Sequence, residues 1–150
     1  MTRSSLIVPS AWVVGSGRTI DGGEATHTPC TASELAQPLA AQVGRWYRIG
    51  FAVSDRTAGA VAPRLSGGSL RPGTAISVDG QVTDRIQAVT GNDTLEFSAD
   101  AAFDGAVSDI LLNLETAACL DAGTHYLWLE PQNADGVPGP INAPLTIEVI

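Results

Sequence analysis

Short runs of β-branched and apolar residues alternate with glycine- and aspartate-containing turns along most of this chain. Residues of these types suit the half-buried surface of a pleated sheet. Several such runs at short spacing are typical of an all-β sandwich or barrel, so the pattern predicts roughly ten strands and little helix. The expected strands are residues 6–8, 12–14, 18–20, 46–54, 60–65, 74–78, 82–89, 94–98, 106–114, 125–130 and 145–150.

Three local signals refine this pattern. Asp79-Gly80 is a two-residue hairpin signal, and it predicts that 74–78 pairs with 82–89. Residues 55–59 predict a turn at the end of the strand 46–54. Residues 31–37 are compatible with a short helix or with a strand.

Composition and charge narrow the function classes. The 150 residues are 44% hydrophobic and 16% charged, which is too apolar for a disordered chain and enough for a sizeable core. The net charge of −8 repels phosphate backbones, so nucleic acid is not an expected partner. No apolar stretch approaches the ~20 residues of a membrane helix, so membrane insertion is not expected either. The N-terminus does not read as a secretory signal.

The residues that usually carry catalysis or bind metal are sparse. His27 and His125 are the two histidines, and no G-x-S-x-G or H-E-x-x-H pattern accompanies them. Most aspartates lie in turn-type sequences, where turn chemistry explains them. Cys30 and Cys119 are in no metal-binding spacing, and two reduced, buried thiols are expected, with a disulfide as the less favoured alternative. The sequence therefore predicts no catalytic residue, no metal site and no cofactor.

Sugar recognition needs an aromatic platform with polar side chains beside it. Trp46 and Tyr47 are adjacent in a predicted strand, so they face opposite ways and one of them belongs to the core. Tyr126 and Trp128 share one strand face and form the best exposed pair, which suits a glycan or a partner subunit equally. The candidate ligand-binding residues are Tyr126, Trp128, Trp12, Arg48 and Arg64.

From about residue 10 to 112 the sequence resembles a carbohydrate-binding, galactose-binding-type jelly-roll module that is frequent in phage and prophage proteins. The resemblance rests on an ordered series of short elements rather than on one diagnostic motif. The series is Trp12 with Gly15 and Gly17, residues 23–27, 35–39, Gly44 with 47–49, 57–59, 67–68, 79–80, 95–97 and 103–105.

This resemblance implies a jelly-roll β-sandwich over residues 1–114. Residues 115–150 are then expected to add strands that complete the sandwich or dock on a partner. It also implies a non-enzymatic virion component, made in the cytoplasm of the bacterial host, such as a capsid decoration, a head fibre or a tail fibre or spike. The expected partners are other virion subunits, further copies of the chain in a homo-oligomer, and a cell-surface polysaccharide.

Three alternatives stay open at this point. The chain is a cementing or connector protein without a ligand, a cellular lectin-like carbohydrate-binding module, or, least expected, a small glycan-active enzyme. A fold-level likeness does not by itself decide among them.

Overall fold

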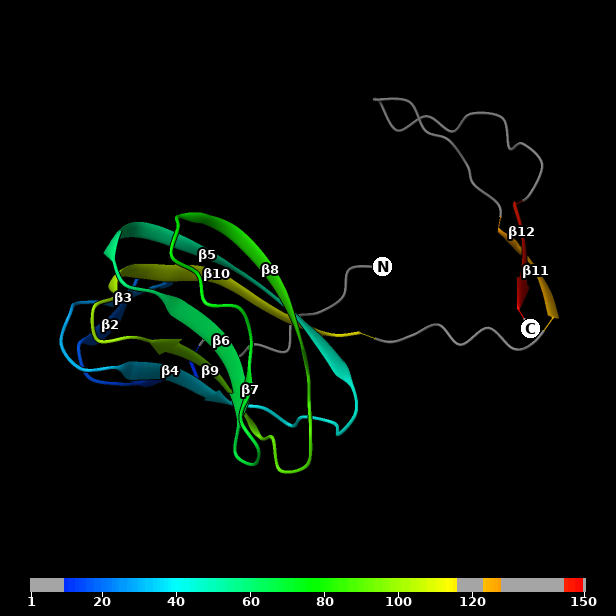
Figure 1. Ribbon diagram of the computed structural model, residues 1–150, viewed down its shortest axis with the longest axis horizontal. Coiled ribbons are helices and arrows are strands. Elements are labelled where there is room, and N and C mark those ends of the chain that lie inside the picture. Colours follow the sequence, from blue (N-terminus) through cyan, green and yellow to red (C-terminus); the bar gives the residue numbers. More distant parts are fainter. Residues whose placement is uncertain (1–9, 116–122, 128–144, 150) are drawn as a thin grey trace, which may run out of the picture. The chain divides into compact units, whose positions relative to one another are not determined.

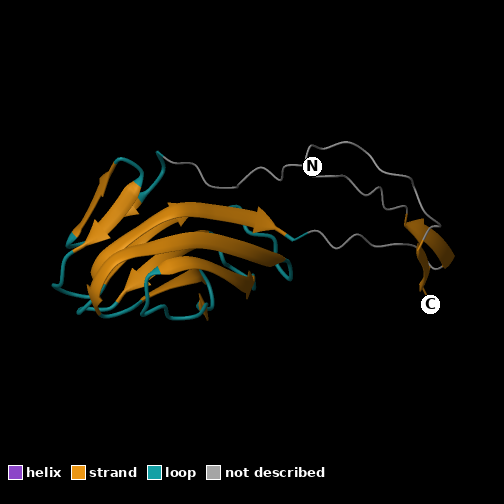
Figure 2. Cartoon of the chain, turned by 90° about the horizontal axis from the view of Figure 1, so that it is seen from above, coloured by secondary structure: helices purple, strands orange, loops and turns teal. Residues whose placement is uncertain are grey.

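The computed structural model describes residues 10–115, 123–127 and 145–149. The chain divides into two compact units, Met1–Thr116 and Ala117–Ile150. Every regular element in the described ranges is a β-strand, as Figure 2 shows, so the predicted all-β fold is confirmed for these residues. None of the described elements is a helix that could cross a membrane.

The first unit is a sandwich of two five-stranded antiparallel sheets (Figure 1). Sheet A contains, in order of pairing, β1 (Val13–Val14), β4 (Ser33–Pro38), β9 (Thr94–Ala99), β6 (Val61–Ser66) and β7 (Arg71–Pro72). Sheet B contains, in order of pairing, β2 (Arg18–Asp21), β3 (Glu24–His27), β10 (Asp104–Leu114), β5 (Trp46–Ala58) and β8 (Gly80–Gln87).

Alternate residues of both sheets fill the space between them. In β9, for example, Leu95, Phe97 and Ala99 are buried while the residues between them are half-buried. The rings of Phe51 and Phe97 meet edge to face across the sandwich, with centroids 5.0 Å apart. Few aromatics are available, so aliphatic side chains make up most of this core. Its largest fully buried side chains include Tyr47, Phe51, Phe97, Phe103, Leu35, Ile49, Leu65, Leu95 and Leu112.

Two aspartates with left-handed backbone angles interrupt the pairing of β5 with β10. Asp55 in β5 and Asp109 in β10 both have a φ of 51°. The register between the two strands shifts beside each of them, which is the signature of a β-bulge. Aspartate tolerates this conformation better than most residues. The predicted turn over 55–59 is therefore wrong, because β5 absorbs Asp55 in a bulge and continues to Ala58.

Residues 74–78 do not pair with β8, so the hairpin predicted at Asp79-Gly80 is wrong. Ile76 forms an isolated bridge to Val61 of sheet A. β8 starts at Gly80 and pairs with β5 in sheet B along its whole length. The chain changes sheets at this dipeptide, because pairing with distant strands outweighs the local turn signal.

The segment 31–37 forms strand β4 rather than a helix. β4 pairs with β9 from Ser33 to Pro38 and with β1 at Leu35 and Ala36. The neighbouring strand β3 was not predicted, because its Glu-Ala-Thr-His sequence carries a single apolar side chain. It is held by pairing with β2 on one side and β10 on the other.

The second unit contains the strands β11 (Gly123–Leu127) and β12 (Leu145–Val149). They pair with each other in antiparallel fashion, with Gly123 opposite Val149 and Leu127 opposite Leu145. The rest of the predicted strand 125–130, like the predicted strand 6–8, lies outside the described residues. The division at 114/115 and the docking of the C-terminal strands stay predictions.

Candidate functional site

Strand β5 sorts its two adjacent aromatic residues onto opposite faces of sheet B. Tyr47 points into the core and is 1% exposed, and its hydroxyl accepts a hydrogen bond from the backbone N–H of Gln42. Trp46 points outward and is 38% exposed. The prediction that one of the pair is buried is confirmed. Trp46 is thereby a large aromatic side chain on an open sheet surface.

Around Trp46, the outer face of sheet B is formed by three strands, β8, β5 and β10, which run side by side in Figure 1. Cross-strand partners share a face, so the pairing registers decide which side chains belong to it. We call this surface the Trp46 face. It consists of Trp46, Arg48, Gly50 and Ala52 from β5, Gln81, Thr83, Arg85 and Gln87 from β8, Ser108, Leu111 and Asn113 from β10, and Glu115 just beyond β10.

The middle of the Trp46 face has short side chains on its central strand. Gly50 and Ala52 occupy the central strand, so β5 projects no long side chain there. A Cβ placed on Gly50 would make ordinary van der Waals contacts, at 3.9 Å, with Cβ of Leu111 and the carbonyl oxygen of Val82, so it would fit without overlap. Leu111 and Thr83 lie opposite Gly50 on the two neighbouring strands. The result is a shallow floor along β5 that begins at Trp46.

Two arginines and one carboxylate organise the Trp46 end of this face. The guanidinium carbon of Arg85 lies 4.6 Å from the centroid of the Trp46 ring, a cation–π contact. Arg85 donates to Oε2 of Glu115 through Nε at 2.9 Å and Nη2 at 2.6 Å. Arg48 donates to Oε1 of the same carboxylate through Nε at 3.0 Å. Glu115 therefore holds both guanidinium groups beside the indole.

The backbone fixes the position of Glu115 itself. Its N–H donates to the carbonyl oxygen of Trp46 at 2.8 Å, one residue past the end of β10. The hydrogen bond from Arg85 is the largest cause that holds the pKa of Glu115 below its ordinary value of 4.5; desolvation opposes it, and the hydrogen bond from Arg48 and the charges of both arginines add to the lowering. Glu115 is therefore ionised at neutral pH and keeps both arginines paired.

Arg64, another predicted site residue, lies on the opposite surface of the sandwich. It points outward from β6 in sheet A, and all three of its nitrogens are engaged. Nη2 contacts Glu34 at 2.8 Å, Nε contacts Glu96 at 2.5 Å, and Nη1 donates to Ser98 at 3.0 Å. One guanidinium faces two carboxylates there, so its positive charge is neutralised, and no cation–π contact of Arg64 occurs among the described residues.

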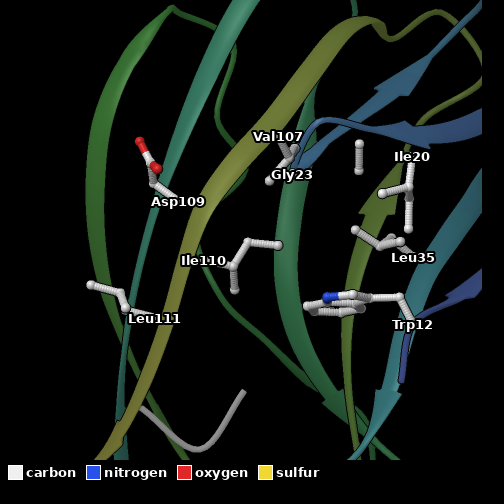
Figure 3. A pocket seen from close by; sticks show the side chains of 9 residues that line it. Trp12, Ile20, Gly23, Leu35, Val107, Asp109, Ile110 and Leu111 are labelled. Atoms are coloured by element: carbon white, nitrogen blue, oxygen red, sulfur yellow. The ribbon is translucent and has the colours of Figure 1, made fainter. Parts of the chain in front are cut away.

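Trp12 lines a pocket of about 470 Å³ that opens between the two sheets (Figure 3). β3 pairs with β10 only from Gly105 to Val107, so the later part of β10 leaves a gap on that side. In Figure 3, Ile110 points toward the Trp12 indole, whereas Asp109 and Leu111 point away from it across β10. The side chains that face the opening are apolar. A sugar would find few hydrogen-bond partners inside, so the pocket does not suit one.

The predicted site residues of the first unit, Trp12, Arg48 and Arg64, are therefore not brought together. Arg48 lies on the Trp46 face, Arg64 on the outer surface of sheet A, and Trp12 at the gap between the sheets. Tyr126 lies in β11 opposite Thr146 of the second unit, and Trp128 lies outside the described residues.

The side chains of His27 and Asp100 have structural roles. His27 is buried, and its Nδ1 donates to the carbonyl oxygen of Phe103. Asp100 accepts from the backbone N–H groups of Ala60 and Ala102, both at 2.9 Å. No group of three potential metal-ligating side chains occurs in the part of the chain that the structure describes.

Cys30 is a free, exposed cysteine, so the expectation of a buried thiol is wrong for this residue. It lies after the end of β3, and its Sγ is 3.9 Å from Nε2 of His27. Cys119 lies outside the described residues.

Sequence reasoning missed Arg85, Gln87 and Glu115 as site residues. The alternation in 80–87 does place Gln81, Thr83 and Arg85 on one face, as the burial pattern confirms. What the sequence does not reveal is the partner strand. The sequence predicts that 82–89 pairs with 74–78. It therefore does not place the polar face of this strand beside Trp46.

The sequence matches no protein-family model and no curated protein. Among solved structures, the chain is similar to "TmCBM61 in complex with beta-1,4-galactotriose", with 21% identity, a TM-score of 0.55, and coverage of 76% of this chain and 100% of that one. It is also similar to the "Mannan Binding Module from Man5C", with 12% identity, a TM-score of 0.50, and coverage of 77% and 100%. These likenesses establish the fold, a jelly-roll β-sandwich shared with carbohydrate-binding modules, as predicted.

Proposed function

We propose that the sandwich unit is a non-catalytic carbohydrate-binding module whose ligand lies along the Trp46 face. The observation that carries the proposal is the exposed Trp46 with Arg48, Arg85 and Gln87 around it and a low floor beside it. Sugar rings stack their C–H faces on aromatic rings, and planar polar side chains bond their hydroxyl groups. Trp46 supplies the first feature with the part of its ring that Arg85 does not cover, and its neighbours supply the second.

The floor along β5 suits an extended chain better than a single sugar. The outward-facing positions of β5 from Trp46 to Ala52 span about 20 Å at the usual rise per strand residue, although Ala52 at the far end is only 9% exposed. Side chains on both flanking strands offer hydrogen-bonding groups along this length, among them Gln81, Thr83 and Asn113. The similarity to a module solved with β-1,4-galactotriose and to a module named for mannan binding supports the same interpretation.

The proposal extends to the setting that the sequence resemblance implies, a virion component such as a decoration, head-fibre or tail-fibre subunit. In that setting, repeated copies of a weak glycan site would gain avidity. A cellular lectin-like module is equally compatible with the fold. Immunogold labelling of purified phage particles from the source strain tests the setting: labelled particles are expected, and unlabelled particles with free antigen would favour the cellular module.

Calorimetry with a panel of soluble polysaccharides tests the binding site. We expect at least one glycan to bind the full chain, and Trp46→Ala to weaken that binding by tenfold or more, about the value of one stacked aromatic contact. Leu70→Ala is the matched control, because Leu70 is 52% exposed and lies outside the Trp46 face. Equal affinities of the wild type and Trp46→Ala would refute the site, and the absence of any glycan ligand would refute the function.

A further inference from the structure

The two arginines of the Trp46 face have unused donor groups. Arg48 contacts Glu115 only through Nε, and Arg85 uses Nε and Nη2. Both Nη atoms of Arg48 and Nη1 of Arg85 therefore have no hydrogen-bond partner among the described residues. The two side chains are 59% and 52% exposed, whereas Glu115 is 18% exposed. The acidic partner lies lower in the surface, and the free donors face solvent.

The same end of the face carries an excess of positive charge. Two guanidinium groups share the one carboxylate of Glu115, which leaves a local balance of +1 on a chain whose net charge is −8. The oxygens of the nearby Asp84 carboxylate accept hydrogen bonds from the backbone N–H groups of Thr74 and Arg85, so they do not pair with the two guanidinium groups. This patch contrasts with Arg64, where two carboxylates compensate one guanidinium.

The carboxylate of Asp109 makes the two ends of the Trp46 face different in charge. This carboxylate contacts Nε2 of Gln81 at 3.5 Å, near Ala52 and the far end of the floor. Gln81 and Arg85 are four residues apart on β8, or about 13 Å along the strand. That separation exceeds the ~8 Å Debye length at physiological ionic strength, so Asp109 hardly offsets the arginines. One end of the face therefore attracts anions and the other does not.

We propose that the Trp46 face is selective for polysaccharides that carry carboxylate groups, an inference that rests on the proposed function. A planar guanidinium matches a carboxylate with two parallel hydrogen bonds, and both Nη groups of Arg48, which have no partner in the described part of the chain, can supply them. The sugar ring that bears the carboxylate stacks beside Trp46. Neighbouring sugars extend toward Gln81 and Asp109, where hydroxyl groups are the suitable partners.

Matched polysaccharides test this selectivity. Calorimetry on the full chain uses polygalacturonate, alginate and hyaluronate, each paired with a form whose carboxyl groups are esterified or reduced. β-1,4-Galactotriose and a manno-oligosaccharide serve as neutral glycans, and dextran sulfate serves as a polyanion without carboxylates. We expect at least one carboxylated polymer to bind about tenfold or more tightly than its modified form, with affinity falling as salt rises.

Two arginine variants test whether the selectivity for carboxylated polymers depends on Arg48. Arg48→Gln is expected to reduce affinity for the carboxylated polymer about tenfold and to weaken its salt dependence. Arg71→Gln changes the net charge equally but lies on β7 of sheet A, so it is expected to leave affinity unchanged. Circular dichroism checks that both variants are folded.

The outcomes separate this inference from the proposed function. Neutral or modified glycans that bind as well as the carboxylated forms, with sensitivity to Trp46→Ala, would overturn the selectivity and leave the glycan site standing. Dextran sulfate that binds equally well would show attraction to any polyanion and would also overturn it. Binding of no glycan at all would overturn both.

Discussion

Glu115 is the residue on which the arrangement of the Trp46 face depends. Its backbone N–H bonds to Trp46, and its carboxylate holds Arg48 and Arg85. Because the pKa of Glu115 is lower in the folded chain than its ordinary 4.5, these contacts stabilise the fold above pH 4.5. That contribution is lost as the pH falls through the lowered pKa.

An NMR titration of the Glu115 carboxyl carbon tests this account. The midpoint is expected below 4.5 in the wild type, because protonation has to break the hydrogen bonds from the arginines. In Arg85→Gln the midpoint is expected to rise, since the largest cause of the shift is removed. A midpoint that is the same in both proteins would contradict the geometry described here.

Cys30 yields a second test at the scale of one residue. Its side chain is exposed, so the native protein is expected to react with a thiol reagent such as DTNB without unfolding. The measurement uses Cys119→Ser, in which Cys30 is the remaining thiol, with Cys30→Ser as the comparison. If Cys119→Ser reacted only in denaturant, the exposed position of Cys30 would be wrong.

The sequence predicts correctly which face of the sheet a side chain occupies where alternation along one strand determines it. The opposite faces of Trp46 and Tyr47 follow from adjacency in one strand, and the structure has Tyr47 in the core. The grouping of Trp46 with Arg85 and Glu115 did not follow, because these residues come from three segments that only the sheet brings together.

At the scale of elements, glycines at strand ends decide whether the strands can pack. Gly59 follows β5 with a φ of 69°, and a Cβ there would lie 2.2 Å from the backbone nitrogen of Phe103. Gly44 has a similar φ of 80°, but a Cβ there would meet nothing within 4 Å. A substitution at Gly44 would therefore introduce backbone strain alone, whereas a substitution at Gly59 would introduce both backbone strain and steric overlap.

We expect Gly44→Ala to lower the free energy of unfolding by about 1–2 kcal/mol, the cost of a left-handed angle alone. Gly59→Ala is expected to lower it by about 2–5 kcal/mol, because overpacking adds to that cost. Urea denaturation of the two variants measures both values. Equal losses would mean that Gly59 is not packed against Phe103.

The strands themselves were largely predictable, and the links between them were not. Hydrophobic alternation identified most of the strand segments of the sandwich, including the long β5 and β10. It failed at Asp55 and at Asp79-Gly80, where turn-type residues occur within a bulge and at a crossing between sheets. In both places contacts distant in sequence determine the backbone, and a local signal cannot report them.

At the scale of the whole molecule, the described core belongs to one unit. All of its members lie between Ala25 and Leu112, within the unit Met1–Thr116. We expect a protein of residues 1–116 to unfold cooperatively and to bind the same glycan as the full chain with similar affinity. Calorimetric unfolding and binding measure this, and a fragment that aggregates or fails to bind would show that residues 117–150 are needed.

The boundary of such a fragment matters for the site. A fragment that ends at residue 114 lacks Glu115, so Arg48 and Arg85 lose the carboxylate that positions them. We expect this shorter fragment to fold but to bind glycan more weakly than 1–116. Equal affinity of the two fragments would show that Glu115 does not organise the face.

Binding of a glycan on the outer face of sheet B can be mapped by an NMR titration of the ¹⁵N-labelled chain with the tightest glycan from the panel. We expect chemical-shift changes concentrated in residues 46–52, 81–87 and 111–115, including the indole N–H of Trp46. Changes concentrated instead on sheet A around Arg64, or around Trp12 at the gap between the sheets, would contradict it.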